Sequence, residues 1–241
     1  MCVDYARAMR SLSMLALVVS IATAAHAQPL PKMAPLDQYL IADRNAEIAL
    51  ARSAAPPSIS NDATVLVLTR RGYETAVEGK NGFVCFVDRS WQKTVDDPDF
   101  WNPKMRAPTC VNAPAARSIL PFQHQLTALA LSGATREQIS TKLKAILAAK
   151  TITPEAGAMA YMMSKQQHLD DKNPPWHSHV MFYLPGTIDS PVLGANLEAS
   201  PVLGGASVVP GLGTMPYSVY FIPVDVWSDG TPAPPLMGMH H

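Results

Sequence analysis

The feature that most limits what this chain can fold into is its N-terminal segment, which has the pattern of a secretory signal. Arg7 and Arg10 give a positively charged start, residues 12–23 form a short apolar stretch, and Ala25-His26-Ala27 places small residues before a cleavage point. We therefore expect residues 1–27 to be removed after Ala27. The mature protein is then periplasmic or extracellular.

The length of the apolar stretch separates a cleaved signal from a membrane anchor. It is too short to cross a bilayer, and no later segment reaches the roughly 18 apolar residues that a spanning helix needs. Met9 is an alternative start, because it leaves a conventional signal beginning Met-Arg. Removal of 27 of the 241 residues leaves 214, enough for one sizeable core and short for two domains.

The charge balance of the mature chain indicates what it does not bind. Without Arg7, Arg10 and Asp4, 17 of the 19 basic and 18 of the 19 acidic side chains remain, a net charge near −1. Such a chain has no long-range attraction for nucleic acid or for an anionic membrane. With 48% hydrophobic and 16% charged residues, the composition is typical of a packed globule.

Two cysteines remain after the signal is removed, Cys85 and Cys110. An even pair in an oxidising compartment most often forms a disulfide, and these two are too far apart for a C-x-x-C redox or zinc motif. No cysteine follows the apolar stretch, where a lipid anchor would be attached. We therefore predict one structural disulfide, closing a loop of roughly 25 residues and worth about 3 kcal/mol.

The pattern along the chain predicts one α+β domain. Residues 28–42 are expected to be an extended leader, residues 43–230 the domain and residues 231–241 a C-terminal tail. The domain should contain an antiparallel sheet, with a meander of three short strands at 64–87 and later strands at 177–184 and 217–226. Helices at 43–53 and 122–166 should cover one face of it.

Helix signals are clearest in the middle of the chain. Thr135 is a predicted N-cap and Gln138 completes a capping box. Pro154 and Glu155 are residues typical of a helix start, so a second helix is expected there. Residues 91–121 are interrupted by five prolines, and residues 185–216 read as a long Gly/Pro-rich loop. Such a loop in a compact domain is usually a lid, a binding loop or a mobile segment.

A cluster of histidines and aspartates is the candidate site. His177 and His179 point to the same face if their segment is a strand, and Ser178 and Val180 belong to the opposite, more apolar face. His168, Asp170 and Asp171 lie just upstream. Two histidines with a third N or O ligand form catalytic zinc sites. His168 would be the third ligand, and Asp170 or Asp171 a hydrogen-bond partner or general base.

The alternative is that these histidines only line a half-exposed strand. The His-x-His pair superficially resembles that of the cupins, which carry a glutamate a few residues later. Residues 181–185 contain no glutamate, so the cupin properties are not transferred to this chain.

Two other patterns are weaker candidates for a functional site. Residues 237–241, Met-Gly-Met-His-His, combine ligand types that suit copper(I), although a chain end usually frays. Ser90-Trp91-Gln92-Lys93 matches the S-x-x-K motif of penicillin-recognising enzymes, but the required Lys-Thr-Gly is missing.

The sequence thus leaves two functional hypotheses. The first is an exported ligand-binding or accessory protein whose partner is an unknown small molecule or protein. The second is a metal-dependent hydrolase of the zinc type that uses the His-x-His strand.

Overall fold

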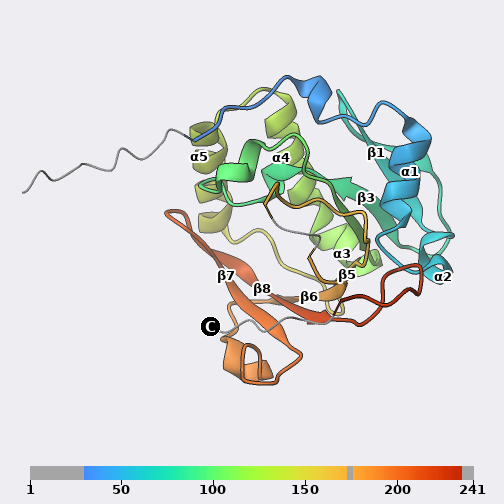
Figure 1. Cartoon of the computed structure of the whole chain (residues 1–241). Helices are drawn as coiled ribbons and strands as arrows, with labels where there is room; N and C mark the ends of the chain where they lie inside the picture. Colours follow the sequence, from blue (N-terminus) through green and yellow to red (C-terminus); the bar gives the residue numbers. More distant parts are fainter. Residues whose placement is uncertain (1–29, 173–175, 235–241) are drawn as a thin grey trace, which may run out of the picture.

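The computed structural model describes residues 30–172 and 176–234, and within these residues eight strands form one sheet (Figure 1). The order across the sheet is β2-β1-β3-β4-β5-β6-β8-β7. The strands are β1 (Thr64–Thr69), β2 (Gly72–Val77), β3 (Val84–Asp88), β4 (Ala107–Val111), β5 (Met159–Met162), β6 (His179–Pro185), β7 (Leu203–Val209) and β8 (Gly213–Pro223). The helices are α1 (Arg44–Arg52), α2 (Pro57–Ser60), α3 (Ala113–Ser118), α4 (Leu120–Leu131) and α5 (Arg136–Ala149), with short 3-10 turns η1 (Leu36–Gln38), η2 (Ser90–Gln92), η3 (Pro98–Trp101) and η4 (Ser190–Leu193).

The predicted α+β class and the mostly antiparallel sheet are confirmed. The meander lies further along the chain than expected, in the consecutive antiparallel pairs β3-β4, β4-β5 and β5-β6. β1 and β2 form the predicted hairpin, but β3 pairs with β1 in parallel. The chain reaches β3 by crossing over rather than by a tight hairpin turn, which makes the sheet mixed at this end.

Two strands lie where the sequence indicated irregular chain. β4 occupies the proline-rich segment 91–121, and Pro108 within it opposes Val87 of β3. β7 occupies the predicted loop 185–216 at the edge of the sheet. β4 pairs with β3 and with the more distant β5, and local patterns carry little information about such pairing. β7 pairs with β8, which follows it after a short turn, and its glycines obscure the strand pattern.

The helix predicted from Pro154 onwards is wrong, because β5 takes its place. Residue 157 is a glycine with φ 78°, in a turn that leads directly into the strand. Ala160 of β5 pairs with Val111 of β4 and with Met181 of β6, and it is fully buried. A small residue with strands on both sides is satisfied by ladder hydrogen bonds, so tertiary pairing overrides the helix-start signal.

The larger core lies between the sheet and the layer formed by α3, α4 and α5 (Figure 1). Thr135 caps α5 with the predicted capping box to Gln138, and Ile139, Leu143 and Ile146 turn inward from this helix. Tyr39, in the predicted leader, is also fully buried here, and its hydroxyl donates to the carbonyl of Trp101 at 2.8 Å. We call this side of the sheet the inner face.

The opposite face of the sheet, which we call the outer face, is covered by α1. Ala51 of α1 packs on Val65, Val87 and the disulfide between Cys85 and Cys110, which join the paired strands β3 and β4. The predicted disulfide is confirmed, and it is the bond expected of a protein in an oxidising compartment.

A buried ion pair ties α1 to the end of β3. The side chains of Arg89 and Glu47 are 0% and 1% exposed, and Arg89 Nη2 lies 2.7 Å from Glu47 Oε1. Glu47 Oε1 also accepts from the backbone N–H of Leu68, and Arg89 donates to the carbonyls of Tyr39 and Val87. A buried pair is tolerated only when further hydrogen bonds satisfy both groups, as they do here.

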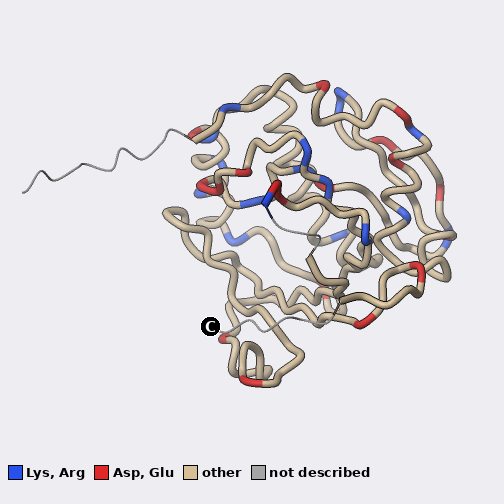
Figure 2. Tube along the Cα trace, in the orientation of Figure 1, with Lys and Arg blue, Asp and Glu red and all other residues tan. Residues whose placement is uncertain are grey.

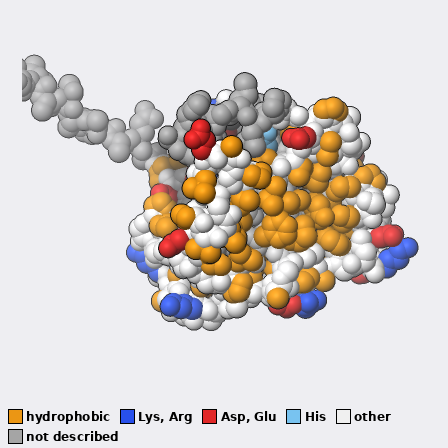
Figure 3. All heavy atoms as spheres, turned by 90° about the horizontal axis from the view of Figure 1, so that it is seen from below, with side chains coloured by type: hydrophobic (Ala, Val, Ile, Leu, Met, Phe, Trp, Pro, Cys, Tyr) orange, Lys and Arg blue, Asp and Glu red, His pale blue; other side chains and the backbone are white. Residues whose placement is uncertain are grey.

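Beyond β4, the outer face of the sheet is not covered by α1, and its surface is apolar. Val180 and Phe182 of β6 lie beside Ile222 of β8 and Tyr161 of β5 on this side, and each is half-buried. Figure 3 shows apolar side chains gathered over this region with charged groups at its rim. Charged residues are scattered over the rest of the described chain (Figure 2), whereas β6, β7 and β8 contain no Lys, Arg, Asp or Glu.

Within the described residues, no helix is long and apolar enough to cross a membrane.

Candidate functional site

In the structure, the strand face that carries His179 is the buried one, opposite to the prediction. β6 begins at His179 rather than at His177, and His179 is 2% exposed. Its face also carries Met181 and Tyr183, which pack into the inner core. Val180 and Phe182, which belong to the more apolar face of this strand, lie on the outer face instead. The reason is that α4 and α5 cover the inner face, and the large Tyr183 ring fills the space beneath them.

His179 is held as a neutral, packed imidazole. Its ring centroid lies 4.4 Å from that of Trp176 and 6.1 Å from that of Phe221. Nδ1 lies 2.7 Å from the carbonyl oxygen of His177 and donates to it. Burial lowers the pKa of His179 to about 4, although the hydrogen bond to His177 acts in the opposite direction.

The upstream residues form a separate, exposed cluster. His168 Nε2 lies 2.9 Å from Asp171 Oδ1, and Lys104 donates to Asp171 Oδ2 at 3.1 Å. These two contacts, the His168 one first, lower the pKa of Asp171. His168 also exchanges backbone hydrogen bonds with Arg106, and Asp170 accepts from the N–H of Lys172.

The predicted metal ligands therefore do not form one group. No three His, Cys, Asp or Glu side chains in segments 30–172 and 176–234 are placed to hold a metal ion. The zinc hypothesis stays a prediction, which elemental analysis of protein from its native compartment would test. Residues 1–27, with the signal, and 237–241, with the copper-type ligands, lie outside the described residues.

The serine of the S-x-x-K pattern is not accessible. Ser90 is 0% exposed in η2, and Lys93 is ion-paired with Asp97 and Asp99 at 3.5 and 3.7 Å. A nucleophile needs access to its substrate, so this arrangement is structural.

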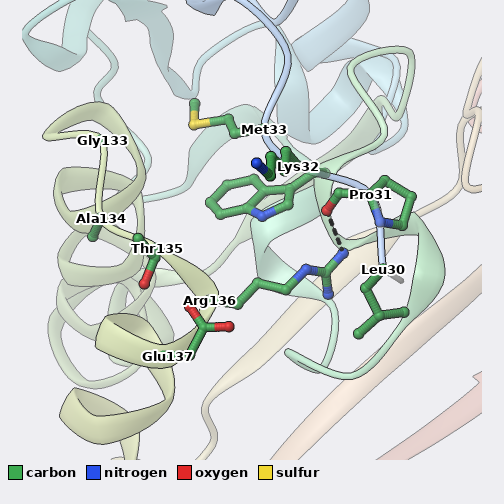
Figure 4. A pocket seen from close by; sticks show the side chains of 10 residues that line it. Leu30, Pro31, Lys32, Met33, Gly133, Ala134, Thr135, Arg136 and Glu137 are labelled. Carbon is green, nitrogen blue, oxygen red and sulfur yellow. Dashed lines mark hydrogen bonds between the residues drawn. The ribbon is translucent and has the colours of Figure 1, made fainter. Parts of the chain in front are cut away.

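One cavity, of about 670 Å³, lies where α5 begins (Figure 4). Arg136 reaches across it to the carbonyl of Pro31 at 3.4 Å, and also donates to the carbonyls of Val95 and Asp97. Its guanidinium lies over the ring of Phe100 at 4.9 Å. The capping box of α5 already uses the hydroxyl of Thr135. The polar groups of this cavity thus hold the N-terminal segment to α5 and leave little for a ligand.

A second cavity, of about 180 Å³, has the opposite character. It lies on the inner face between the β6-β8-β7 end of the sheet and the helices α4 and α5, and we call it the tyrosine pocket. Its apolar walls are Ile119, Phe122, Leu126, Leu143, Val209 and Met215, and its polar lining residues are Gln92, Lys93, Thr94, Gln123, Tyr183, Ser207 and Tyr217.

Two buried tyrosines define the floor of the tyrosine pocket. Tyr183 and Tyr217 are 6% and 7% exposed, and their ring centroids lie 6.2 Å apart at 71°. Within the described part of the chain, neither hydroxyl makes a protein hydrogen bond. Burial raises the pKa of both phenols, so both stay protonated and remain donors at neutral pH.

Gln123 of α4 lies at the roof of the pocket. Its Oε1 is closed off from water and from the cavity, and among the described residues no donor reaches it. The two tyrosine hydroxyls differ from it, because they have no protein partner among the described residues but stay accessible to water. They can therefore donate to a molecule that enters the cavity.

An irregularity in the sheet shapes this site. The register of β7 and β8 shifts between Ala206 and Val208, so that residues 215–217 of β8 lie opposite Ser207 alone. Pro216, which has no N–H to offer, sits in the middle of this shift. Bulges of this kind redirect side chains, and here Ser207, Met215 and Tyr217 all line the tyrosine pocket.

Sequence reasoning missed this site. The sequence places Tyr183 and Tyr217 in predicted strands and Gln123 in a predicted helix, and nothing local marks them as a site. Pro216 within a β-rich run was the one local signal of an irregular strand.

Comparison with known proteins gives no match: no family model, no curated protein and no solved structure is similar to this chain. The functional argument therefore rests on the geometry of the tyrosine pocket.

Proposed function

We propose that this protein is an exported binding protein that holds a small molecule in the tyrosine pocket. The observation that carries the proposal is the pair of largely buried tyrosines, Tyr183 and Tyr217, whose hydroxyls line the cavity without a protein partner among the described residues. Both hydroxyls remain accessible to water, so they can donate to a bound molecule in its place.

The placement of the cavity supports the same function. Its walls come from the sheet on one side and from α4 and α5 on the other, so most of the site is rigid before a ligand arrives. The end of the β7-β8 hairpin contributes Ser207, Val209 and Met215. These residues belong to the segment 185–216, for which the sequence left a lid, a binding loop and a mobile segment open, and part of which forms β7.

The location in the periplasm or medium is part of the proposal. It is supported by the disulfide between Cys85 and Cys110 and by the signal-like N-terminal sequence. Mass spectrometry of the N-terminus from fractionated cells would test it. An intact residue 1–27 segment on cytosolic protein would contradict it.

A matched pair of variants tests the pocket. Ser207 lines it, whereas the adjacent Val208 is 63% exposed, so Ser207→Trp should fill the cavity and Val208→Trp should leave it open. A panel of neutral, anionic and cationic compounds of one to three rings would be screened by ligand-observed NMR. We expect hits that bind wild type and Val208→Trp but not Ser207→Trp. Hydrogen exchange should then slow in residues 203–217.

The opposite results are equally clear. Absence of any hit across the panel, or hits that bind Ser207→Trp as well as wild type, would refute the proposed site. The two variants must show the same cooperative thermal transition as wild type. If Ser207→Trp does not fold, loss of binding in Tyr183→Phe/Tyr217→Phe serves as the criterion instead.

A further inference from the structure

The described sheet has two edges, and they differ in charge. β2 lies at one edge and β7 at the other. β2 carries Glu74, which is ion-paired with Arg71, and Arg44 donates to the carbonyl of Thr75 at 3.3 Å. β7 contains no Lys, Arg, Asp or Glu, and Val208 within it is 63% exposed. An uncharged edge strand is a template on which another strand can pair, unless something covers it.

A segment between β6 and β7 lies against this end of the sheet. Residues 186–199, which contain η4, run beside β7 and β8 (Figure 1), and we call them the edge strap. The hydroxyl of Ser218 accepts from the N–H of Ile188 at 2.8 Å, and the hydroxyl of Tyr220 donates to the carbonyl of Ile188 at 3.0 Å. Ser218 and Tyr220 are 0% and 2% exposed. The edge strap is therefore anchored on β8 before it reaches β7.

At β7 the edge strap takes the place of a neighbouring strand. The side-chain amide of Asn196 donates to the carbonyl of Gly204 at 2.9 Å and accepts from the N–H of Gly204 at 3.0 Å. The backbone N–H of Asn196 donates to the carbonyl of Val202 at 3.0 Å, and the hydroxyl of Ser190 donates to the carbonyl of Gly204 at 2.7 Å. An antiparallel strand bonds to both the N–H and the C=O of one residue in the same way. Asn196 thus imitates the backbone of a strand with its side chain.

The two residues that meet in this contact suit it. Asn196 has φ 59°, in the left-handed region that asparagine adopts more readily than most residues. Gly204 has φ 101°, and a Cβ atom at this position would collide with the carbonyl oxygen of Val219. Residue type and geometry at both positions therefore favour the same closed arrangement.

Without the edge strap, β7 would present a longer edge. Alternate residues of a strand direct their N–H and C=O to the same side, so Val202, Gly204 and Ala206 share the outer side of β7. The edge strap occupies groups of the first two, and a bulge follows Ala206. The edge that stays open is therefore short. Release of Asn196 would lengthen it to the size of an ordinary strand.

We infer that the edge strap keeps β7 unpaired, and that the strand it excludes is β7 of a second copy of this chain. Two identical strands that meet antiparallel across a twofold axis offer each other the same N–H and C=O groups. Since β7 carries no charge, the copies do not repel each other at this edge. When the contact between Asn196 and Gly204 is lost, two copies join edge to edge through β7. This inference is independent of the ligand of the tyrosine pocket.

The test breaks the contact at Asn196 and measures association. Asn196 is exposed, so Asn196→Ala removes both amide hydrogen bonds and leaves the core untouched. In analytical ultracentrifugation at rising protein concentration, wild type should stay a monomer and the variant should form dimers. Asn112→Ala is the matched control, because the Asn112 amide also bonds to backbone groups, those of Gly157 and Met159, away from β7. The control should stay monomeric.

A dimeric wild type would overturn the inference, and so would dimers in Asn112→Ala or an Asn196→Ala variant that stays monomeric. If Asn196→Ala lacks the cooperative thermal transition of wild type, Ser190→Ala replaces it. This change removes the hydroxyl that donates to the carbonyl of Gly204, and it should cause the same association at a higher protein concentration. A monomeric Ser190→Ala would then decide against the inference.

Hydrogen exchange and a second substitution locate the pairing. At low concentration of Asn196→Ala, the N–H of Gly204 should exchange roughly threefold to tenfold faster than in wild type, the value of one neutral hydrogen bond. Protection should return at concentrations where dimers form. Val208→Lys in the same background places a charge on the edge and should restore the monomer. Dimers that persist in Asn196→Ala/Val208→Lys, or exchange at Gly204 that does not change with concentration, would place the association elsewhere and overturn the inference.

Discussion

Asp88 provides a quantitative test of the inner core. This carboxyl, at the end of β3, is 6% exposed, and its Oδ2 accepts from the hydroxyl of Thr109 at 3.2 Å. Within the described residues, Oδ1 has no partner. Burial raises the pKa of Asp88 from 3.8 to about 7, although Thr109 and the neighbouring Arg89 both act to lower it.

The sign of the pH effect follows from this pKa. Below pH 4 the carboxyl is protonated in both the folded and the unfolded chain. Between about pH 4 and 7 the unfolded chain loses the proton while the folded protein keeps it, so the free energy of unfolding falls as pH rises. From 3.8 to about 7, at about 1.4 kcal/mol for each pH unit, the loss amounts to about 4 kcal/mol.

Asp88→Asn should remove this dependence. The amide keeps an oxygen for Thr109 and does not ionise. The variant should therefore gain about 4 kcal/mol of stability relative to wild type between pH 4 and pH 8. Urea unfolding at half-unit pH steps measures it, and Asp225→Asn, a change at an exposed loop residue, is the control. A difference between Asp88→Asn and wild type that stays constant with pH would refute the argument.

Three further changes test other parts of the fold. Glu47→Gln leaves the buried Arg89 guanidinium without a counter-ion and should cost about 3–5 kcal/mol in urea unfolding; a loss below 1 kcal/mol would contradict a buried pair. Replacing Cys85 and Cys110 by alanine should cost about 3 kcal/mol, and dithiothreitol should lower the melting temperature of wild type but not of the variant. Burial holds the pKa of His179 at about 4. The stability that the neutral histidine contributes above pH 6.5 should therefore disappear as pH falls to 4. His179→Gln should abolish this dependence of the free energy of unfolding on pH, and an unchanged dependence would place the histidine at the surface.

Features with local causes were predictable from the sequence. The capping box of Thr135 and Gln138 starts α5 because the cap and its partner are three residues apart. The run of β-branched and aliphatic residues at 64–69 forms β1, and Arg71-Gly72 turns the chain into β2. The two remaining cysteines had only each other as partners once the signal was set aside.

Other features depended on what lies across the fold. Residues 159–162 became a strand because β4 and β6 offered pairing on both sides, although Pro154 signals a helix. The alternation of side chains along β6 indicates which residues share a face. Only the position of α4 and α5 determines which of the two faces is buried. His179 is buried for that reason, while the metal hypothesis itself stays a prediction.

The tyrosine pocket is the extreme case. Its lining comes from six separate stretches of chain between Gln92 and Tyr217. Periodicity and capping act over a few residues, and they fix the helices, the turns and the strand faces of this protein. A cavity is the space that remains after distant elements have packed, so its size, its neutrality and its unpaired hydroxyls exist only in the folded chain.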